Sequence, residues 1–171
     1  LLAFLRFNLM FSEDTNRHAL EHITYGNLVE ITDVLQNELS LIGLGVNDPT
    51  VNIIVSADST DLKFLADYDN DNVSETIRYY LGDPSTAAST DNPNDRMLFR
   101  QIDSNPPKII GVGLTDFYFT YFDKLGNVTS NPADISVIEV NLVTESVTYA
   151  GKTYPKVAWH GKITPLNLYG K

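Results

Sequence analysis

The 171-residue sequence contains no cysteine. Disulfide bonds, thiol catalysis and cysteine-ligated zinc are therefore excluded. Basic residues are also few, because 12 lysines and arginines stand against 22 aspartates and glutamates, which gives a formal net charge of −10. A surface of this charge repels phosphate backbones and attracts cations, so we expect no nucleic-acid partner.

Signatures of common catalytic sites are missing as well. There is no G-x-S-x-G motif, and Gly111-Val112-Gly113 is only a fragment of a nucleotide-binding loop that precedes a strand-like segment. His160 is a lone histidine beside Trp159, and a structural role is expected for it. The sequence therefore predicts a protein that is not an enzyme.

Proline is absent before Pro49, and the preceding residues have the pattern of one long helix. Apolar residues recur every three or four positions on one face, which is the period of an α-helix. They are Leu20, Ile23, Leu28, Ile31, Val34, Leu35, Leu39 and Ile42. The opposite face is polar and carries Glu21, Asn27, Glu30, Asp33, Gln36, Asn37 and Glu38. Gly43 and Gly45 mark the predicted end of the helix.

The first residues, 1–11, are apolar apart from Arg6 and Asn8. Eleven residues are too few to cross a bilayer, which takes about 20 as a helix. One interpretation is that they end a longer membrane anchor whose beginning precedes Leu1. The alternatives are the start of an ordinary buried helix and a remnant of a signal peptide.

After Pro49 the sequence is typical of strands and turns. Segments rich in β-branched and aromatic residues alternate with Asp, Asn, Gly and Pro. The predicted strands are 51–55, 61–66, 75–81, 97–102, 114–122, 135–143 and 146–149, with 156–159 and 162–168 as further candidates. We predict an α+β fold in which a helical stalk, residues 1–45, packs on an antiparallel β-sheet head, residues 46–171.

One acidic segment has the spacing of a calcium loop. Residues 67–75 read DYDNDNVSE, and the oxygens of alternate residues in a tight turn suit a hard cation. The candidate ligands are Asp67, Asp69, Asp71, the main-chain carbonyl of Val73, and Glu75. The alternative is a solvated turn built from good turn formers, because the glycine and the final glutamate of an EF-hand loop are missing.

A second motif is a short match to a metalloprotease string. His18, Glu21 and His22 fit H-x-x-E-H, in which two histidines four apart on a helix can bind one zinc ion. A catalytic site also needs a third ligand and a pocket. Because the motif lies on a projecting helix, two exposed or partner-facing histidines are the expected outcome.

Three stretches of the chain resemble the type IV pilin-like superfamily, and within it the PilW-type minor pilins and pseudopilins. Residues 16–45 look like the second half of the pilin helix with its glycine exit. Residues 62–81 are similar to the acidic turn of the family, and residues 114–146 to its late hairpin and following strand. The cleavage signature of the family and its acidic residue near the mature N-terminus are not present.

The resemblance implies a pilin-like fold and a structural subunit of a type IV pilus-like or pseudopilus filament on the bacterial cell surface, held in the inner membrane before assembly. Its partners would be copies of itself or other pilin-like subunits. The residues expected to pack in the filament are Leu1, Leu2, Phe4, Leu5, Phe7, Leu9, Met10 and Phe11. The alternative function is a membrane-anchored extracellular binding or adhesion module that depends on calcium.

Overall fold

A computed structural model describes residues 2–151 and 153–168, with side chains from Ser12 onward. It contains one α-helix, seven β-strands and three short 3-10 helices. In chain order these are α1 (Leu2–Ser40), β1 (Ile54–Ala57), β2 (Asp61–Ala66), β3 (Glu75–Leu81), η1 (Pro84–Ala87), β4 (Arg96–Ile102), β5 (Lys108–Phe122), η2 (Pro132–Asp134), β6 (Val137–Glu145), β7 (Lys156–Ile163) and η3 (Leu166–Leu168).

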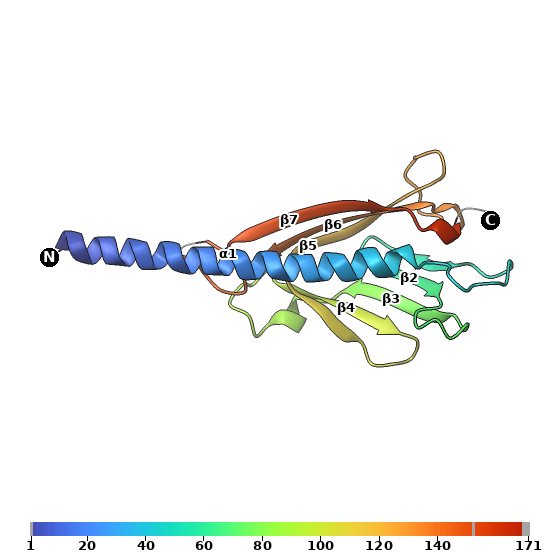
Figure 1. The fold of residues 1–171 in the computed structure, drawn as a ribbon, viewed down its shortest axis with the longest axis horizontal. Coiled ribbons are helices and arrows are strands. Elements are labelled where there is room, and N and C mark those ends of the chain that lie inside the picture. Colours follow the sequence, from blue (N-terminus) through green and yellow to red (C-terminus); the bar gives the residue numbers. More distant parts are fainter. Residues whose placement is uncertain (1, 152, 169–171) are drawn as a thin grey trace.

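The strands form a single antiparallel sheet in which each strand pairs with the next one along the chain, in the order β1 to β7. The sheet curls around α1, so that β5, β6 and β7 lie along one side of the helix and β2, β3 and β4 along the other (Figure 1). The beginning of α1 extends beyond the end of the sheet (Figure 1).

The predicted fold class, an α+β pilin-like arrangement of a stalk on a β-sheet head, is wrong. The fold is mostly β, and its sheet is a curled half-barrel of seven consecutive strands rather than a small sheet with a helix laid on it. The periodicity of the sequence identifies single strands, but how many of them join one sheet depends on long-range pairing. Here the coiling that twisted strands undergo lets the sheet enclose the helix.

The second half of α1 supplies one wall of the hydrophobic core. The predicted apolar face is confirmed from Leu28 onward, because Leu28, Ile31, Leu35, Leu39 and Ile42 are buried. It is wrong for Ile23, which is 60% exposed.

Close contact between the helix and β5 depends on a glycine. A Cβ atom placed on Gly111 would lie 2.5 Å from Cδ1 of Ile31, so a larger residue at this position would push the helix away. The fragment 111–113, which was expected to precede a strand, lies inside β5.

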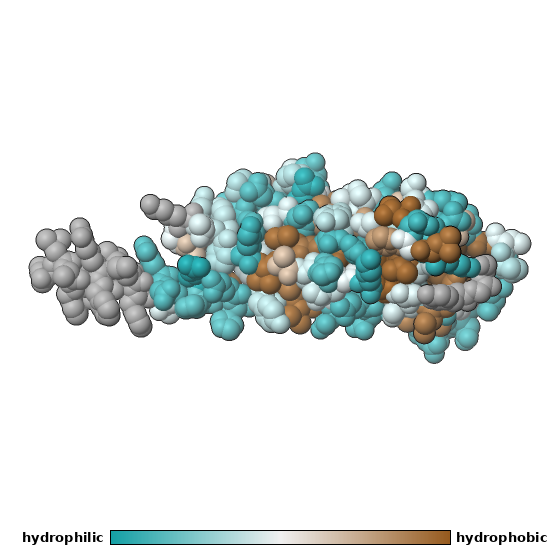
Figure 2. Space-filling view, turned by 90° about the horizontal axis from the view of Figure 1, so that it is seen from above, coloured by the Kyte–Doolittle hydropathy of each residue, from teal (hydrophilic) through white to brown (hydrophobic). Residues whose placement is uncertain are grey.

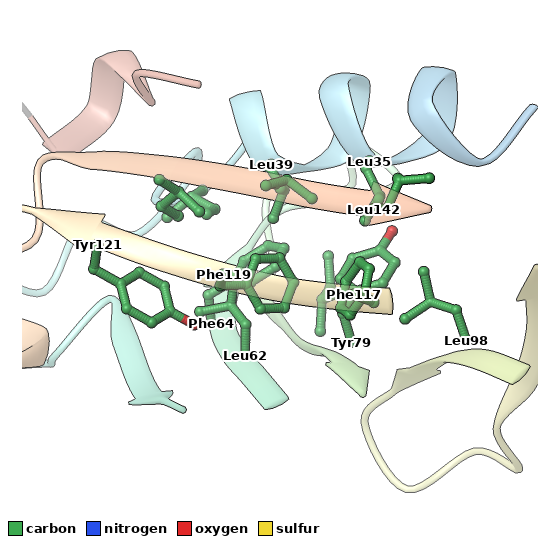
Figure 3. Packing of buried hydrophobic residues seen from close by; sticks show 14 of the residues in the cluster. Leu35, Leu39, Leu62, Phe64, Tyr79, Leu98, Phe117, Phe119, Tyr121 and Leu142 are labelled. Carbon is green, nitrogen blue, oxygen red and sulfur yellow. The ribbon is translucent and has the colours of Figure 1, made fainter. Parts of the chain in front are cut away.

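Aromatic and branched side chains from the sheet fill the space beneath the helix (Figure 3). Leu62, Phe64, Tyr79 and Leu98 come from β2, β3 and β4, and Phe117, Phe119 and Leu142 come from β5 and β6. The rings of Phe117 and Phe119 meet edge to face with centroids 4.9 Å apart, a favoured geometry for aromatic pairs.

The end of α1 is confirmed at the predicted glycines. Gly43 and Gly45 have φ angles of 81° and 71°, a backbone conformation that residues other than glycine rarely adopt. The turn then joins the sheet, because the Gly43 amide donates to the carbonyl of Leu65 at 2.8 Å and the Asp67 amide donates to the carbonyl of Leu44 at 2.8 Å.

Most strand predictions are confirmed, and two of them, 61–66 and 75–81, have the bounds of β2 and β3. The first strand begins later than predicted, at Ile54. Residues 146–149 form a turn, and η3 occupies the end of the segment predicted at 162–168.

Replacing Gly26 with alanine is expected to stabilise the protein. Gly26 lies in the exposed part of α1, and no heavy atom is within 4 Å of an added Cβ. Alanine loses less backbone entropy than glycine in a helix, so the free energy of unfolding should rise by about 0.5–1 kcal/mol. Thermal unfolding followed by circular dichroism measures this effect. The matched variant Gly111→Ala should instead lower the melting temperature, and a Gly26→Ala protein no more stable than the parent would contradict the expectation.

Candidate functional site

The acidic segment forms the turn between β2 and β3. The last residue pair of that ladder joins Ala66 to Glu75, so residues 67–74 form the connecting loop. Asn70 and Asn72 have positive φ angles of 63° and 69°, and asparagine is one of the few residues that tolerate this conformation. The turn therefore bends at the positions where the sequence offers asparagine.

Main-chain amides hold the acidic side chains in place. The carboxylate of Asp67 is 4% exposed and accepts hydrogen bonds from the amides of Asp71 at 3.1 Å and Asn72 at 3.0 Å. The Asp71 carboxylate accepts from the Val73 amide at 2.8 Å, and Glu75 accepts from the Tyr68 amide at 2.8 Å. These bonds stabilise the turn without a ligand.

Three of the five candidate calcium ligands come together. One carboxylate oxygen from each of Asp67, Asp69 and Asp71 lies within 4.8 Å of the others. Calcium binds oxygens at about 2.3–2.6 Å, so ligands on opposite sides of the ion are about 5 Å apart, and this spacing fits. Glu75 is not part of this group of carboxylates. Calcium binding at the acidic turn stays a prediction.

The H-x-x-E-H string lies on an exposed part of α1. His18 and His22 are exposed, and Glu21 accepts hydrogen bonds from Arg17 at 3.0 Å and lies 3.2 Å from Nδ1 of His18. The hydrogen bond from Arg17, followed by the weaker influence of His18, lowers the pKa of Glu21 although slight burial opposes it. In the described part of the chain, no third metal ligand joins these residues.

The eight residues expected to pack in a filament lie outside the described side chains. Leu1 is not described, and for Leu2, Phe4, Leu5, Phe7, Leu9, Met10 and Phe11 only the helical backbone is. His160 is exposed on β7, the last strand of the sheet.

A buried polar cluster joins the helix to the sheet, and sequence reasoning missed it. Glu38, assigned to the polar face, is only 7% exposed. Its carboxylate accepts a hydrogen bond from the hydroxyl of Tyr79 on β3 and forms an ion pair with Arg100 on β4. The guanidinium of Arg100 also lies over the ring of Tyr68, 5.2 Å from its centroid.

The electrostatics of this cluster suit a structural role. Burial, followed by the charge of Glu38, raises the pKa of Tyr79 far above its usual value, so the phenol keeps its proton. Burial lowers the pKa of Arg100, but the charge of Glu38 and the smaller effects of Tyr79 and Tyr68 together outweigh it, and the net pKa is raised. The helical periodicity of the sequence could not reveal this cluster, because Glu38 pairs with Arg100, which lies 62 positions later in the chain.

A groove of about 590 Å³ lies at the end of the body near the turn after α1, between residues 49–54 and 132–136. Val51, Ile53 and Leu125 contribute apolar surface. Its carboxylates already have donors, because Asp123 accepts from the Leu125 amide at 2.8 Å and Asp134 accepts from the Asn131 side chain at 2.8 Å.

Within the described part of the chain, no helix has both the length and the apolar character required to cross a bilayer.

Comparison with known proteins gives no relative for this chain, because no family model and no curated protein sequence matches it. The resemblance to pilin-like proteins therefore stays a prediction.

Proposed function

We propose that the chain is a structural subunit of an extracellular filament of the kind that the resemblance implies, and that it assembles through the start of its N-terminal helix. The observation that carries this proposal is the division of α1 into a part that packs on the sheet and a part that extends beyond it (Figure 1). The packed part belongs to the fold of the subunit, and the extended part is available to a partner.

Burial along α1 supports this division. Residues 12–19 are all exposed, and the first buried residue of the described helix is Thr24. The helix has 39 residues and is about 58 Å long at 1.5 Å per residue. Among the described side chains of the helix, the buried ones all belong to its second half, from Thr24 onward.

A polar segment separates the two parts of the helix. Residues 12–18 read SEDTNRH, and in the space-filling view the helix is hydrophilic where it leaves the body (Figure 2). The preceding residues, 1–11, are mostly apolar in sequence. A polar segment at this position favours burial of the apolar end against a partner rather than against the body of its own subunit.

Energetics favour a partner for that end. An isolated helix is marginally stable in water, and most helical stability in proteins comes from packing of an apolar face. Burial of apolar side chains stabilises an assembly by about 25 cal/mol per Å². When the helix of one subunit contacts a different surface of its neighbour, the subunits build an open helical filament if the rotation between them does not close a ring.

The proposal predicts that assembly is lost when the N-terminal helix becomes charged. The full-length triple variant Phe4→Glu/Phe7→Glu/Phe11→Glu should be monomeric, whereas the parent chain should form large assemblies, because burying three carboxylates in an apolar contact is unfavourable. Analytical ultracentrifugation over a range of concentrations and electron microscopy measure the difference.

The matched control is Leu125→Glu, which changes a residue that is 87% exposed on the body. It should assemble as the parent chain does, and both variants should keep the parent melting temperature. A triple variant that still polymerises, or a parent chain that stays monomeric at every concentration, would contradict the proposal.

A second candidate function is a calcium-dependent binding module anchored by the same helix, and the grouping of Asp67, Asp69 and Asp71 favours it. The same parent chain separates the two functions. A filament subunit associates with itself, whereas an anchored module binds phospholipid vesicles and stays monomeric on them.

A further inference from the structure

The loop between β3 and β4 is attached to the segment that follows β6. The Asp91 amide donates to the carbonyl of Val147 at 3.0 Å, and the Asp91 carbonyl accepts from the hydroxyl of Tyr154 at 2.8 Å. The hydroxyl of Thr148 donates to the Asp91 carboxylate at 3.1 Å. These bonds form a corner, which we define as residues 90–95 together with 145–148 and Tyr154.

Asp95 in this corner is a buried carboxylate without a donor. The residue is 1% exposed, and neither carboxylate oxygen has a hydrogen-bond partner. Its amide donates to the carbonyl of Asn92 at 3.2 Å. The Thr90 hydroxyl donates instead to the carbonyls of Ala87 at 3.0 Å and Asn92 at 3.2 Å.

Such a group requires compensation. Burial raises the pKa of Asp95, the Thr90 hydroxyl lowers it, and the negative charge of Glu145 raises it further, with a net increase. A buried carboxylate is stable only when it is protonated, paired or bound to a metal ion. The charge of Arg96, the next residue, acts on Asp83 instead. Hydrogen bonds from Ser85 lower the pKa of the Asp83 carboxyl group most, and the charge of Arg96 lowers it further.

The neighbours of Asp95 are oxygen donors. The Glu145 carboxylate accepts one hydrogen bond from the Asn92 side chain at 3.0 Å, through Oε2, and an ionised carboxylate has about four lone-pair sites. The Asn92 side-chain oxygen accepts from the Asn94 amide at 3.1 Å. Oxygen ligands of this kind, in loops of irregular shape, suit calcium better than magnesium, which demands octahedral geometry.

We propose that Asp95 and Glu145 bind a calcium ion in this corner. The ion neutralises two carboxylates in a chain whose net charge is −10. It also links the β3–β4 loop to the end of β6, which are far apart in sequence. This site is separate from the acidic turn at residues 67–75 and independent of filament assembly.

Calorimetric titration of the full-length chain with calcium chloride, after removal of metal by a chelator, tests the site. The parent chain should bind calcium, and Asp95→Asn should lose at least tenfold in affinity at this site. Glu145→Gln should lose affinity as well, and because a glutamine oxygen still accepts from Asn92, this variant should keep the fold. Asp69→Asn, in the acidic turn, is the matched control and should retain the corner site. Calcium should raise the melting temperature of the parent and of Asp69→Asn by more than it raises that of either corner variant.

Two results would overturn the proposal. In the first, calcium binding disappears in Asp69→Asn and is unchanged in Asp95→Asn and Glu145→Gln, which places the ion at the acidic turn alone. In the second, the parent chain binds no calcium at millimolar concentration and Asp95→Asn raises the melting temperature, which shows that a proton compensates Asp95.

Discussion

Replacement of Glu38 with alanine should lower the free energy of unfolding by about 3–5 kcal/mol, which is the usual cost of removing one partner from a buried ion pair. Glu38 accepts from Tyr79 and pairs with Arg100, and the Arg100 side chain is only 15% exposed. The variant leaves a guanidinium and a phenol without their acceptor in the core. Denaturant unfolding at equilibrium, followed by tryptophan fluorescence of Trp159, measures the loss.

Two further variants separate the ion pair from the hydrogen bond. Tyr79→Phe removes the hydroxyl alone and should cost about 1 kcal/mol. The double variant Glu38→Met/Arg100→Met removes both charges and should be less destabilised than Glu38→Ala, because no charge stays buried and unpaired. A Glu38→Ala protein that loses less than about 1 kcal/mol would show that water compensates Arg100.

Truncation of Leu35 to alanine is expected to destabilise the protein by about 2–5 kcal/mol, through lost apolar burial and the cavity that remains. Leu35 is fully buried between α1 and the sheet, close to Leu142 in the packed core (Figure 3). Thermal and denaturant unfolding of the full-length variant measure this change.

The matched control is Ile23→Ala, because Ile23 is an apolar residue of the same helix that is 60% exposed. Its stability should change by no more than about 0.5 kcal/mol. If Ile23→Ala lost as much stability as Leu35→Ala, the exposed part of α1 would have a packing partner in solution. Ile23→Ala should then also sediment differently from the parent chain.

Local features of the fold could be predicted from the sequence. The helix, its end at Gly43 and the bounds of β2 and β3 follow from apolar periodicity and turn residues, which act over a few positions. The assembly of seven strands into one curled sheet could not be predicted, because it depends on pairs such as Leu142 with Trp159, set by global register. The pilin resemblance was wrong about the fold for the same reason.

The candidate sites also include features that the sequence predicts and features that it does not. The spacing of Asp67, Asp69 and Asp71 predicts a shared turn, and the three carboxylates do meet there. Neither the burial of Glu38 nor that of Asp95 has a local signal, since each depends on the segments that fold over it.

The position of α1 has a consequence for biosynthesis. The helix is made before the sheet, yet it packs against β5, β6 and β7, which follow it by many residues, and the side chain of Asn167 donates to the carbonyl of Ile42 at 3.3 Å. At about 5–20 residues per second, the ribosome needs several seconds to produce these strands after the helix. During that interval the apolar face of the nascent helix lacks its covering strands, so it offers a binding surface to chaperones before the fold is complete.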